Sequence, residues 1–282
     1  PLDLHGVIEA RRNLPRSAHI VDDVDAPDEG DLAITDEELA VVAAQGFLAS
    51  GVFCDIKRLG TGKGSNKGQK RDLALIVSEV PASVAGMFTT NQICAAPVKV
   101  CAERVSGGVA QAIVVNSGNA NACTGKQGMK DARAMTALTA QQLHMREEHV
   151  FVASTGRIGV NLPMDNVRAG IVAAEQLLNR EHVSANYAAE AIMTSDTRPK
   201  QIAIQFKLGR QTVRIGGMCK GAGMIQPGMS ATGARPAALP QGLHATMLCF
   251  LTTDAAIEAP ALHAAQALNA GVDIQVEVET IE

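Results

Sequence analysis

Aromatic side chains are nearly absent from this chain. Of its 282 residues, six are Phe, one is Tyr and none is Trp, so aromatic residues make up 2% of the sequence. Base stacking and aromatic cages for cations both depend on such rings, and the chain is therefore a poor candidate for either. Because apolar residues still make up 46% of the sequence, the core must be filled by Ala, Val, Ile, Leu and Met.

The chain also has little charge imbalance, no paired cysteine motif and no long apolar run. A formal net charge of -4, with both signs spread along the chain, leaves no basic face for nucleic acid. No window approaches the roughly 20 apolar residues of a membrane span, and no apolar stretch follows a basic region at residues 1–17. We therefore expect a cytoplasmic protein with no nucleic-acid or membrane partner.

The cysteines stand without a CxxC pair, which favours reduced thiols over a disulfide framework or a zinc site: Cys54, Cys94, Cys101, Cys123, Cys219 and Cys249.

The sequence divides into an acidic lead-in and a patterned region. Residues 1–42 are rich in Asp and show little periodicity, which predicts a mobile extension. Further on, short β-branched runs alternate with stretches whose apolar residues recur every three or four positions. This alternation predicts an α/β fold with layered mixed sheets and flanking helices. We expect strands at 73–80, 112–116, 150–154 and 245–253, a hairpin over 202–206 and 212–215, and helices at 130–143, 164–178 and 259–270.

Three polar, Gly-rich segments follow predicted strands, where α/β proteins commonly build their sites. Residues 116–125 (NSGNANACTG) allow close approach to a ligand, but their spacing alone favours a tight structural turn. Residues 154–156 (STG) offer a hydroxyl and backbone N–H groups that could face an oxyanion. In residues 216–227, Lys220 is the only charged residue; it either holds a substrate carboxylate or points into solvent from a turn.

Thr246 is the candidate nucleophile. Taken alone it is a strand threonine, since β-branched residues favour pleated surfaces. The alternative is an N-terminal nucleophile: cleavage of the peptide bond before Thr246 would free an α-amine that can act as the base for the neighbouring hydroxyl. An α-amine has a pKa near 8, so it can take up a proton at neutral pH without a histidine.

These segments, taken together and in order, resemble the ornithine acetyltransferase (glutamate N-acetyltransferase) family over residues 46–257. The resemblance is specific because it is long and collinear. It is carried by KRDLALIVSEVPASVAGMFTTN (70–91), AAPVKV, IVVNSGNANACTGKQG, VASTGRIGVNLPM, AEAIMTSDTRPK (189–200), RIGGMCKGAGMIQP and ATMLCFLTTDAAI (245–257).

The resemblance implies the fold of that family and a chain that cleaves itself between Ala245 and Thr246. Residues 43–245 would then form an α chain and residues 246–282 the incomplete start of a β chain, assembled as α2β2. Thr246 would accept the acetyl group of N2-acetylornithine and pass it to glutamate. By the same resemblance, Thr155 and Gly156 would form the oxyanion hole, and Thr194 and Lys220 would contact substrate together with Thr246.

The resemblance leaves several alternatives open. No metal or organic cofactor is needed for such a transfer, although acetyl-CoA could serve as a co-substrate. Residues 230–244 separate Met229 from Ala245 and contain a second Ala-Thr pair at Ala231 and Thr232, whereas the family joins the two motifs almost directly. An unprocessed, noncatalytic member of the family is therefore one alternative. An N-terminal-threonine amidohydrolase, in which water replaces glutamate, is another.

Overall fold

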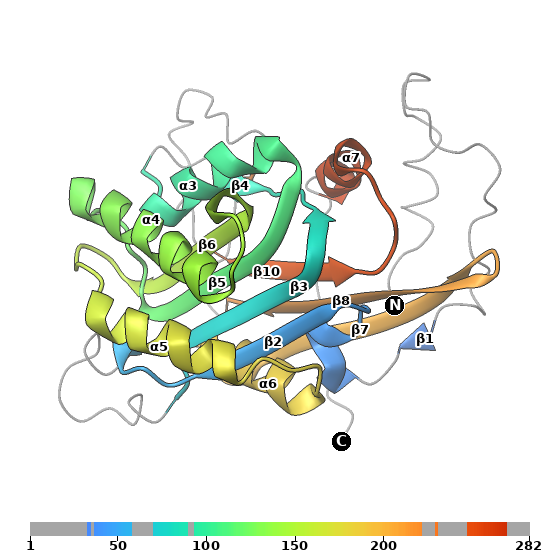
Figure 1. Cartoon of the computed structure of the whole chain (residues 1–282), viewed down its shortest axis with the longest axis horizontal. Helices are drawn as coiled ribbons and strands as arrows, with labels where there is room; N and C mark the ends of the chain where they lie inside the picture. Colours follow the sequence, from blue (N-terminus) through green and yellow to red (C-terminus); the bar gives the residue numbers. More distant parts are fainter. Residues whose placement is uncertain are drawn as a thin grey trace.

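Two four-stranded sheets form the body of the protein (Figure 1). The computed structural model describes residues 33–34, 37–57, 70–89, 93–221, 229–230 and 247–269. The central sheet has the order β2-β3-β5-β6, with bounds Phe47–Val52, Leu73–Ser83, Val109–Asn119 and Val150–Arg157. The outer sheet has the order β1-β7-β8-β10, with bounds Ala33–Ile34, Lys200–Leu208, Gln211–Lys220 and Leu248–Thr253. Strands β4 (Phe88–Thr89) and β9 (Met229–Ser230) form a small separate pair.

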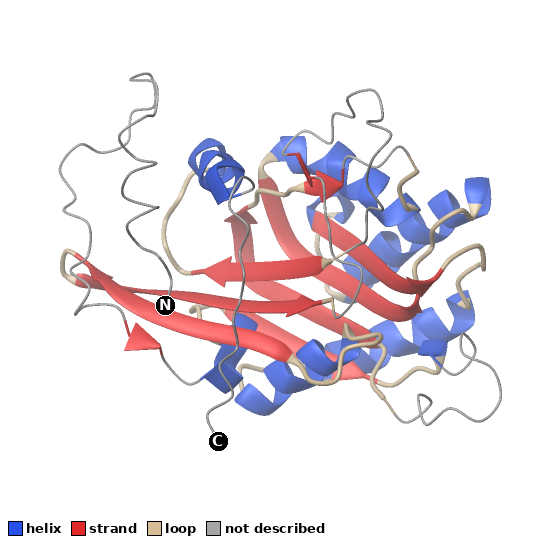
Figure 2. Cartoon of the chain, turned by 180° about the vertical axis from the view of Figure 1, so that it is seen from behind, coloured by secondary structure: helices blue, strands red, loops and turns tan. Residues whose placement is uncertain are grey.

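The sheets are mixed, as the sequence predicts. Strands β5 and β6 are parallel, whereas the other neighbours in both sheets run antiparallel. The predicted hairpin is the β7–β8 pair, and its register places Leu208 opposite Gln211. Seen from behind, the long strands of the outer sheet run across the central sheet (Figure 2). The predicted layered α/β fold is confirmed.

The central sheet is buried on both faces, which explains the continuous apolar run in β3. Successive side chains of a strand point to opposite faces. Leu73 and Leu75 accordingly join the core beneath helices α3 (Ala96–Arg104), α4 (Gly125–Gln142) and α5 (Met164–Gln176). Ala74 and Ile76 join a second core with α6 (His182–Ala191) and the outer sheet. Strands covered on both faces read as unbroken apolar sequence rather than as alternation.

All three predicted helices are present in the structure. Helix α5 starts directly after Pro163, whose fixed φ suits the beginning of a helix. Helix α4 starts at Gly125, five residues before the predicted start. Its buried residues Ala132, Met135 and Thr139 recur every three to four positions, as a one-sided helix requires. Helix α7 covers Ala259–Asn269, close to its prediction. None of the helices in the described ranges is long and apolar enough to span a lipid bilayer.

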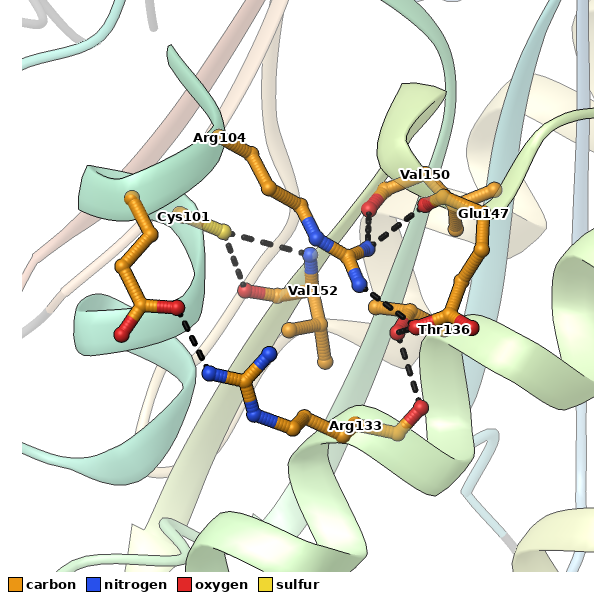
Figure 3. Close-up of polar contacts among 8 residues, drawn as sticks. Cys101, Arg104, Arg133, Thr136, Glu147, Val150 and Val152 are labelled. Atoms are coloured by element: carbon orange, nitrogen blue, oxygen red, sulfur yellow. Dashed lines mark hydrogen bonds and ion pairs between the residues drawn. The ribbon is translucent and has the colours of Figure 1, made fainter. Parts of the chain in front are cut away.

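Polar contacts fasten α3 and α4 to the start of β6 (Figure 3). The Arg104 guanidinium donates to the backbone oxygen of Glu147 (2.7 Å) and pairs with its carboxylate (2.7 Å). The Cys101 thiol donates to the Val152 oxygen (3.1 Å) and accepts from the Val152 N–H (3.3 Å). Burial raises the pKa of Cys101 to about 11, so this residue packs as a neutral thiol. All six cysteines lie in described parts of the chain and are free thiols, as predicted.

The packed structure begins within the extension predicted for residues 1–42. The 3-10 segment η2 (Glu37–Val42) contains Ala40 and Val41, both fully buried. The backbone oxygen of Val41 accepts a hydrogen bond from Thr252 Oγ1 at 2.8 Å, and β1 pairs with β7. Ala40, Val41 and Val42 are buried, and η2 contacts α6 together with β7 and β8 of the outer sheet. Residues 1–32 lie outside the described part of the chain.

Candidate active site

Two of the three polar segments lie side by side at the ends of β5 and β6. Their parallel register pairs Ser117 with Thr155 and Gly118 with Gly156. An ideal Cβ on Gly156 would lie 2.4 Å from the carbonyl carbon of Gly118, so the two backbones approach more closely than any side chain permits. Gly156 also has φ +133°, a conformation that residues with a Cβ rarely adopt. The geometry therefore requires glycine at position 156, which is where the oxyanion hole was predicted.

The asparagines of residues 116–125 are used to hold the backbone. Asn116 Nδ2 donates to the Asn119 oxygen (2.8 Å), and Asn119 Nδ2 donates to the Val160 oxygen (3.0 Å). Ser154 Oγ donates to Asn116 Oδ1 at 2.6 Å, which ties the end of β6 to the end of β5. Asn116 and Asn119 are both buried. These contacts favour the structural interpretation of the segment, which serves to fix Ser154 and the residues that follow it.

Lys220 ends β8 and reaches from the outer sheet to the end of the central sheet. Its Nζ donates to Thr194 Oγ1 at 2.7 Å and to Thr155 Oγ1 at 3.2 Å. The residue is only 6% exposed, which excludes the interpretation as a solvent-pointing turn lysine. Burial lowers the pKa of Lys220, and the nearby Asp196 carboxylate opposes this shift. The structure thus brings together three predicted site residues that are up to 65 positions apart in the sequence.

Asp196 is a member of this cluster that sequence reasoning did not single out. Its carboxylate accepts hydrogen bonds from the Gly221 N–H (2.7 Å), the Lys200 ammonium (2.5 Å) and the Thr194 N–H (3.2 Å). Burial acts to raise the pKa of Asp196, but these hydrogen bonds outweigh it and lower the pKa to about 2. The sequence signal was its place in the block 189–200, two residues after Thr194.

A second buried lysine, also missed from sequence, lies behind the end of β5. Lys57 is 3% exposed, and its backbone N–H donates to Asp72 Oδ2 at 3.0 Å. A Cβ on Gly118 would lie 2.7 Å from the Cα of Lys57, so this residue packs directly against the segment that pairs with Gly156. Burial lowers the pKa of Lys57 to about 8, although the Asp72 and Glu190 carboxylates act in the opposite direction.

The predicted cleavage site, Ala245 and Thr246, lies outside the described residues, as does the second Ala-Thr pair at Ala231 and Thr232. The described part of the strand that follows is informative nevertheless. In the antiparallel pair of β10 and β8, Leu248 lies opposite Lys220. Strand β10 therefore begins, two positions after Thr246 in the sequence, beside Lys220 at the centre of the cluster.

Solved structures share most of this architecture. The arginine biosynthesis bifunctional protein ArgJ from Bacillus halodurans is 41% identical, with a TM-score of 0.64 over 71% of this chain and 99% of that one. An ornithine acetyltransferase from Mycobacterium tuberculosis, solved as a complex with ornithine, is 37% identical. Its TM-score is 0.63, over 71% of this chain and 100% of that one. The predicted ornithine acetyltransferase-like fold is therefore confirmed.

Sequence comparisons agree. The arginine biosynthesis bifunctional protein ArgJ of Symbiobacterium thermophilum is 48% identical over 242 residues, which make up 86% of this chain and 54% of that protein. The chain spans about half the length of the curated relatives it matches. The ArgJ family model matches residues 53–275. The resemblance seen in the sequence blocks is therefore correct, and the chain belongs to the ArgJ family.

Proposed function

We propose that this chain transfers the acetyl group of N2-acetylornithine to glutamate in arginine biosynthesis, through an acetyl ester on Thr246. Family membership supports the reaction, and the relative solved with ornithine supports an ornithine-related substrate. One observation carries the assignment to this site. Lys220 is buried, bonds the hydroxyls of Thr155 and Thr194, and lies opposite the residue two positions after Thr246.

Self-cleavage prepares the nucleophile in this proposal. Hydrolysis of the bond between Ala245 and Thr246 gives Ala245 a carboxylate and Thr246 a free α-amine. The amine then accepts the hydroxyl proton as Thr246 Oγ attacks the acetyl carbonyl of N2-acetylornithine. Ornithine leaves with that proton and the acetyl ester remains. The amine of glutamate attacks the ester, N-acetylglutamate departs, and the Thr246 hydroxyl is restored.

In this proposal the cluster of Lys220, Thr155 and Thr194 stabilises the negative charge that develops during the reaction. Each attack places negative charge on the former carbonyl oxygen, which preorganised donors stabilise. The backbone at Thr155 and Gly156 is held by the pairing with β5, and we assign its N–H groups to that oxygen. An ammonium has three N–H bonds, and Lys220 directs two of them to threonine hydroxyls. We assign the third to an oxygen of the substrate.

Mass spectrometry of the purified chain tests the first step. Processing at the proposed bond replaces the 29.4 kDa species with two fragments that separate before Thr246. We expect Thr246→Ala to remain intact and Thr232→Ala, the matched control in the second Ala-Thr pair, to be processed like the wild type. A single intact wild-type species would contradict the assignment and favour the unprocessed, noncatalytic alternative. Fragments that separate before Thr232 would contradict it as well, because they would make Thr232 the N-terminal residue.

Product analysis tests the transfer itself. Incubation with N2-acetylornithine and glutamate should yield ornithine and N-acetylglutamate in equal amounts, and Thr246→Ala should yield neither. Acetate release that does not depend on glutamate would instead identify an amidohydrolase. Glutamate with acetyl-CoA in place of N2-acetylornithine shows whether acetyl-CoA is a second donor. Native mass spectrometry of the processed protein tests the α2β2 assembly.

A further inference from the structure

Asp196 lies between the segment that follows α6 and the end of β8. Its side chain is fully inaccessible to solvent. The segment after α6 carries Thr194, whose N–H donates to Asp196 Oδ2 at 3.2 Å. The end of β8 carries Lys220, and the N–H of the next residue, Gly221, donates to Asp196 Oδ1 at 2.7 Å. One carboxylate thus binds the backbone on both sides of the Lys220–Thr194 hydrogen bond.

The groups that bond this carboxylate in the described part of the chain are all donors. Two are backbone N–H groups, and the third is the Lys200 ammonium, which lies 2.5 Å from Asp196 Oδ1. An ionised carboxylate only accepts hydrogen bonds and satisfies all three. The amide of an asparagine has one accepting oxygen and one donating nitrogen, so it must place a donor against a donor. Position 196 therefore requires an ionised aspartate, and asparagine, which has nearly the same shape, cannot replace it.

We propose that Asp196 is the positioning residue of the site, which holds Lys220 and Thr194 in the geometry that acetyl transfer requires. The proposal rests on the function proposed above for its catalytic consequence, but its structural part stands alone. In this proposal Asp196 binds protein groups and does not bind the substrate. It acts through the backbone of Thr194 and Gly221 and through its charge, which lies close to the Lys220 ammonium.

Two opposite charges face Lys220 among the described residues. The Asp196 carboxylate raises the pKa of Lys220, and the Lys200 ammonium, on β7, lowers it. On β8, the neighbouring Cys219 thiol stays neutral because burial raises its pKa. Thr155 and Thr194, the direct partners of Lys220, carry no charge. Asp196 also faces Lys57, whose pKa it raises. Removal of Asp196 and removal of Lys200 should therefore move the pKa of Lys220 in opposite directions.

The test compares Asp196→Asn, Lys200→Met and Asp131→Asn in the full chain. Asp131 is a buried carboxylate on α4 and serves as the matched control. For Asp196→Asn we expect kcat to fall about 10- to 100-fold, because a displacement of about 1 Å in a catalytic group has that effect. KM should change less, and the alkaline limb of the pH profile of kcat/KM should move to lower pH. Asp131→Asn should change neither the pH profile nor the ratio of the two constants.

A second readout does not need turnover. In protein labelled with 13C-lysine, the Cε signal of Lys220, assigned by its loss in Lys220→Met, reports the pKa of that residue. We expect a lower pKa in Asp196→Asn, a higher one in Lys200→Met and no change in Asp131→Asn. An unmoved Lys220 signal in the folded variants, or a kcat of Asp196→Asn within twofold of wild type, overturns the proposal. If Asp196→Asn does not fold, Asp196→Glu takes its place, since it keeps the charge but displaces the carboxylate from the Thr194 and Gly221 N–H groups; a kcat within twofold of wild type then overturns the proposal.

The two proposals fail in different ways. A folded, processed wild-type chain that shows the expected Lys220 shifts but no acetyl transfer refutes the proposed function and leaves the role of Asp196 in place. Acetyl transfer with an unmoved Lys220 signal refutes the role of Asp196 alone.

Discussion

Gly156 provides a sharp test of the architecture at the site. Replacement by alanine adds one methyl group at a position with φ +133°. That methyl carbon would meet the Gly118 carbonyl carbon at 2.4 Å, the Asn119 nitrogen at 2.6 Å and the Gly118 Cα at 2.8 Å. All three are backbone atoms of β5. No rotation of a side chain can relieve these contacts, so either the ends of β5 and β6 separate or the backbone of Gly156 changes conformation.

The cost follows from two contributions. A residue with a Cβ in this sparsely populated backbone region costs roughly 1–3 kcal/mol, and insertion of a methyl group into filled space costs about 1–3 kcal/mol. Their sum is about 2–6 kcal/mol for Gly156→Ala. In a chain of this size, each kcal/mol lowers Tm by roughly 2–4 °C. Alanine keeps the backbone N–H, so the expected effect on the proposed oxyanion hole comes from displacement of that donor, and a shift of about 1 Å should reduce kcat about 100-fold.

Gly159→Ala is the matched control. Gly159 also has positive φ, +79°, but nothing lies within 4 Å of the position that its Cβ would take. It should therefore show only the backbone contribution, about 1–2 kcal/mol. Thermal and urea unfolding followed by circular dichroism measure both variants, and acetyl transfer measures the effect on the site. If the two variants unfold within about 0.5 kcal/mol of each other, a margin set by ordinary surface substitutions, the close approach of β5 and β6 is refuted.

Three further outcomes are expected. Asp72→Asn should lower the free energy of unfolding by about 1.5–3 kcal/mol, measured in urea, because the carboxylate accepts the N–H of Cys54 at 2.7 Å in a fully buried position. Iodoacetamide at neutral pH, followed by peptide mass analysis, should label the exposed Cys123 well before the buried Cys101. The pKa of Asp196 falls from 3.8 to about 2 on folding, so its contribution is present above pH 3.8 and is lost as the pH drops towards 2. The stability gap between wild type and Asp196→Asn should therefore shrink by on the order of 2 kcal/mol over that range, and a constant gap would contradict the assigned hydrogen bonds.

Elements with a strong local signal were predictable. The runs at 73–77, 112–116 and 150–154 are apolar and β-branched because helices or the other sheet cover both of their faces. Strand β2, FLASGV, contains Gly51 because the backbone of Tyr187 in α6 lies against it, 2.0 Å from an ideal Cβ. Because this glycine interrupts the apolar pattern, β2 was not predicted from the sequence. Helix α6, HVSANYAAEA, was not predicted either, because it packs through alanines, and alanine occurs on buried and exposed helix faces alike.

The site residues also differ in how far the sequence could predict them. Thr155 and Gly156 follow a recognisable strand, so their place at a sheet edge could be predicted, and the sequence blocks indicated roles for Thr194 and Lys220. The burial of Lys220 could not be predicted, because its partners are 26 and 65 residues away in the sequence. Asp196 was harder still, since what defines it is a set of donors and not a residue pattern. A donor 25 residues later, the Gly221 N–H, has significance only once the end of β8 lies beside the segment after α6. Polar residues in this cluster are thus specified by tertiary pairing, whereas the strands that bring them together are specified locally.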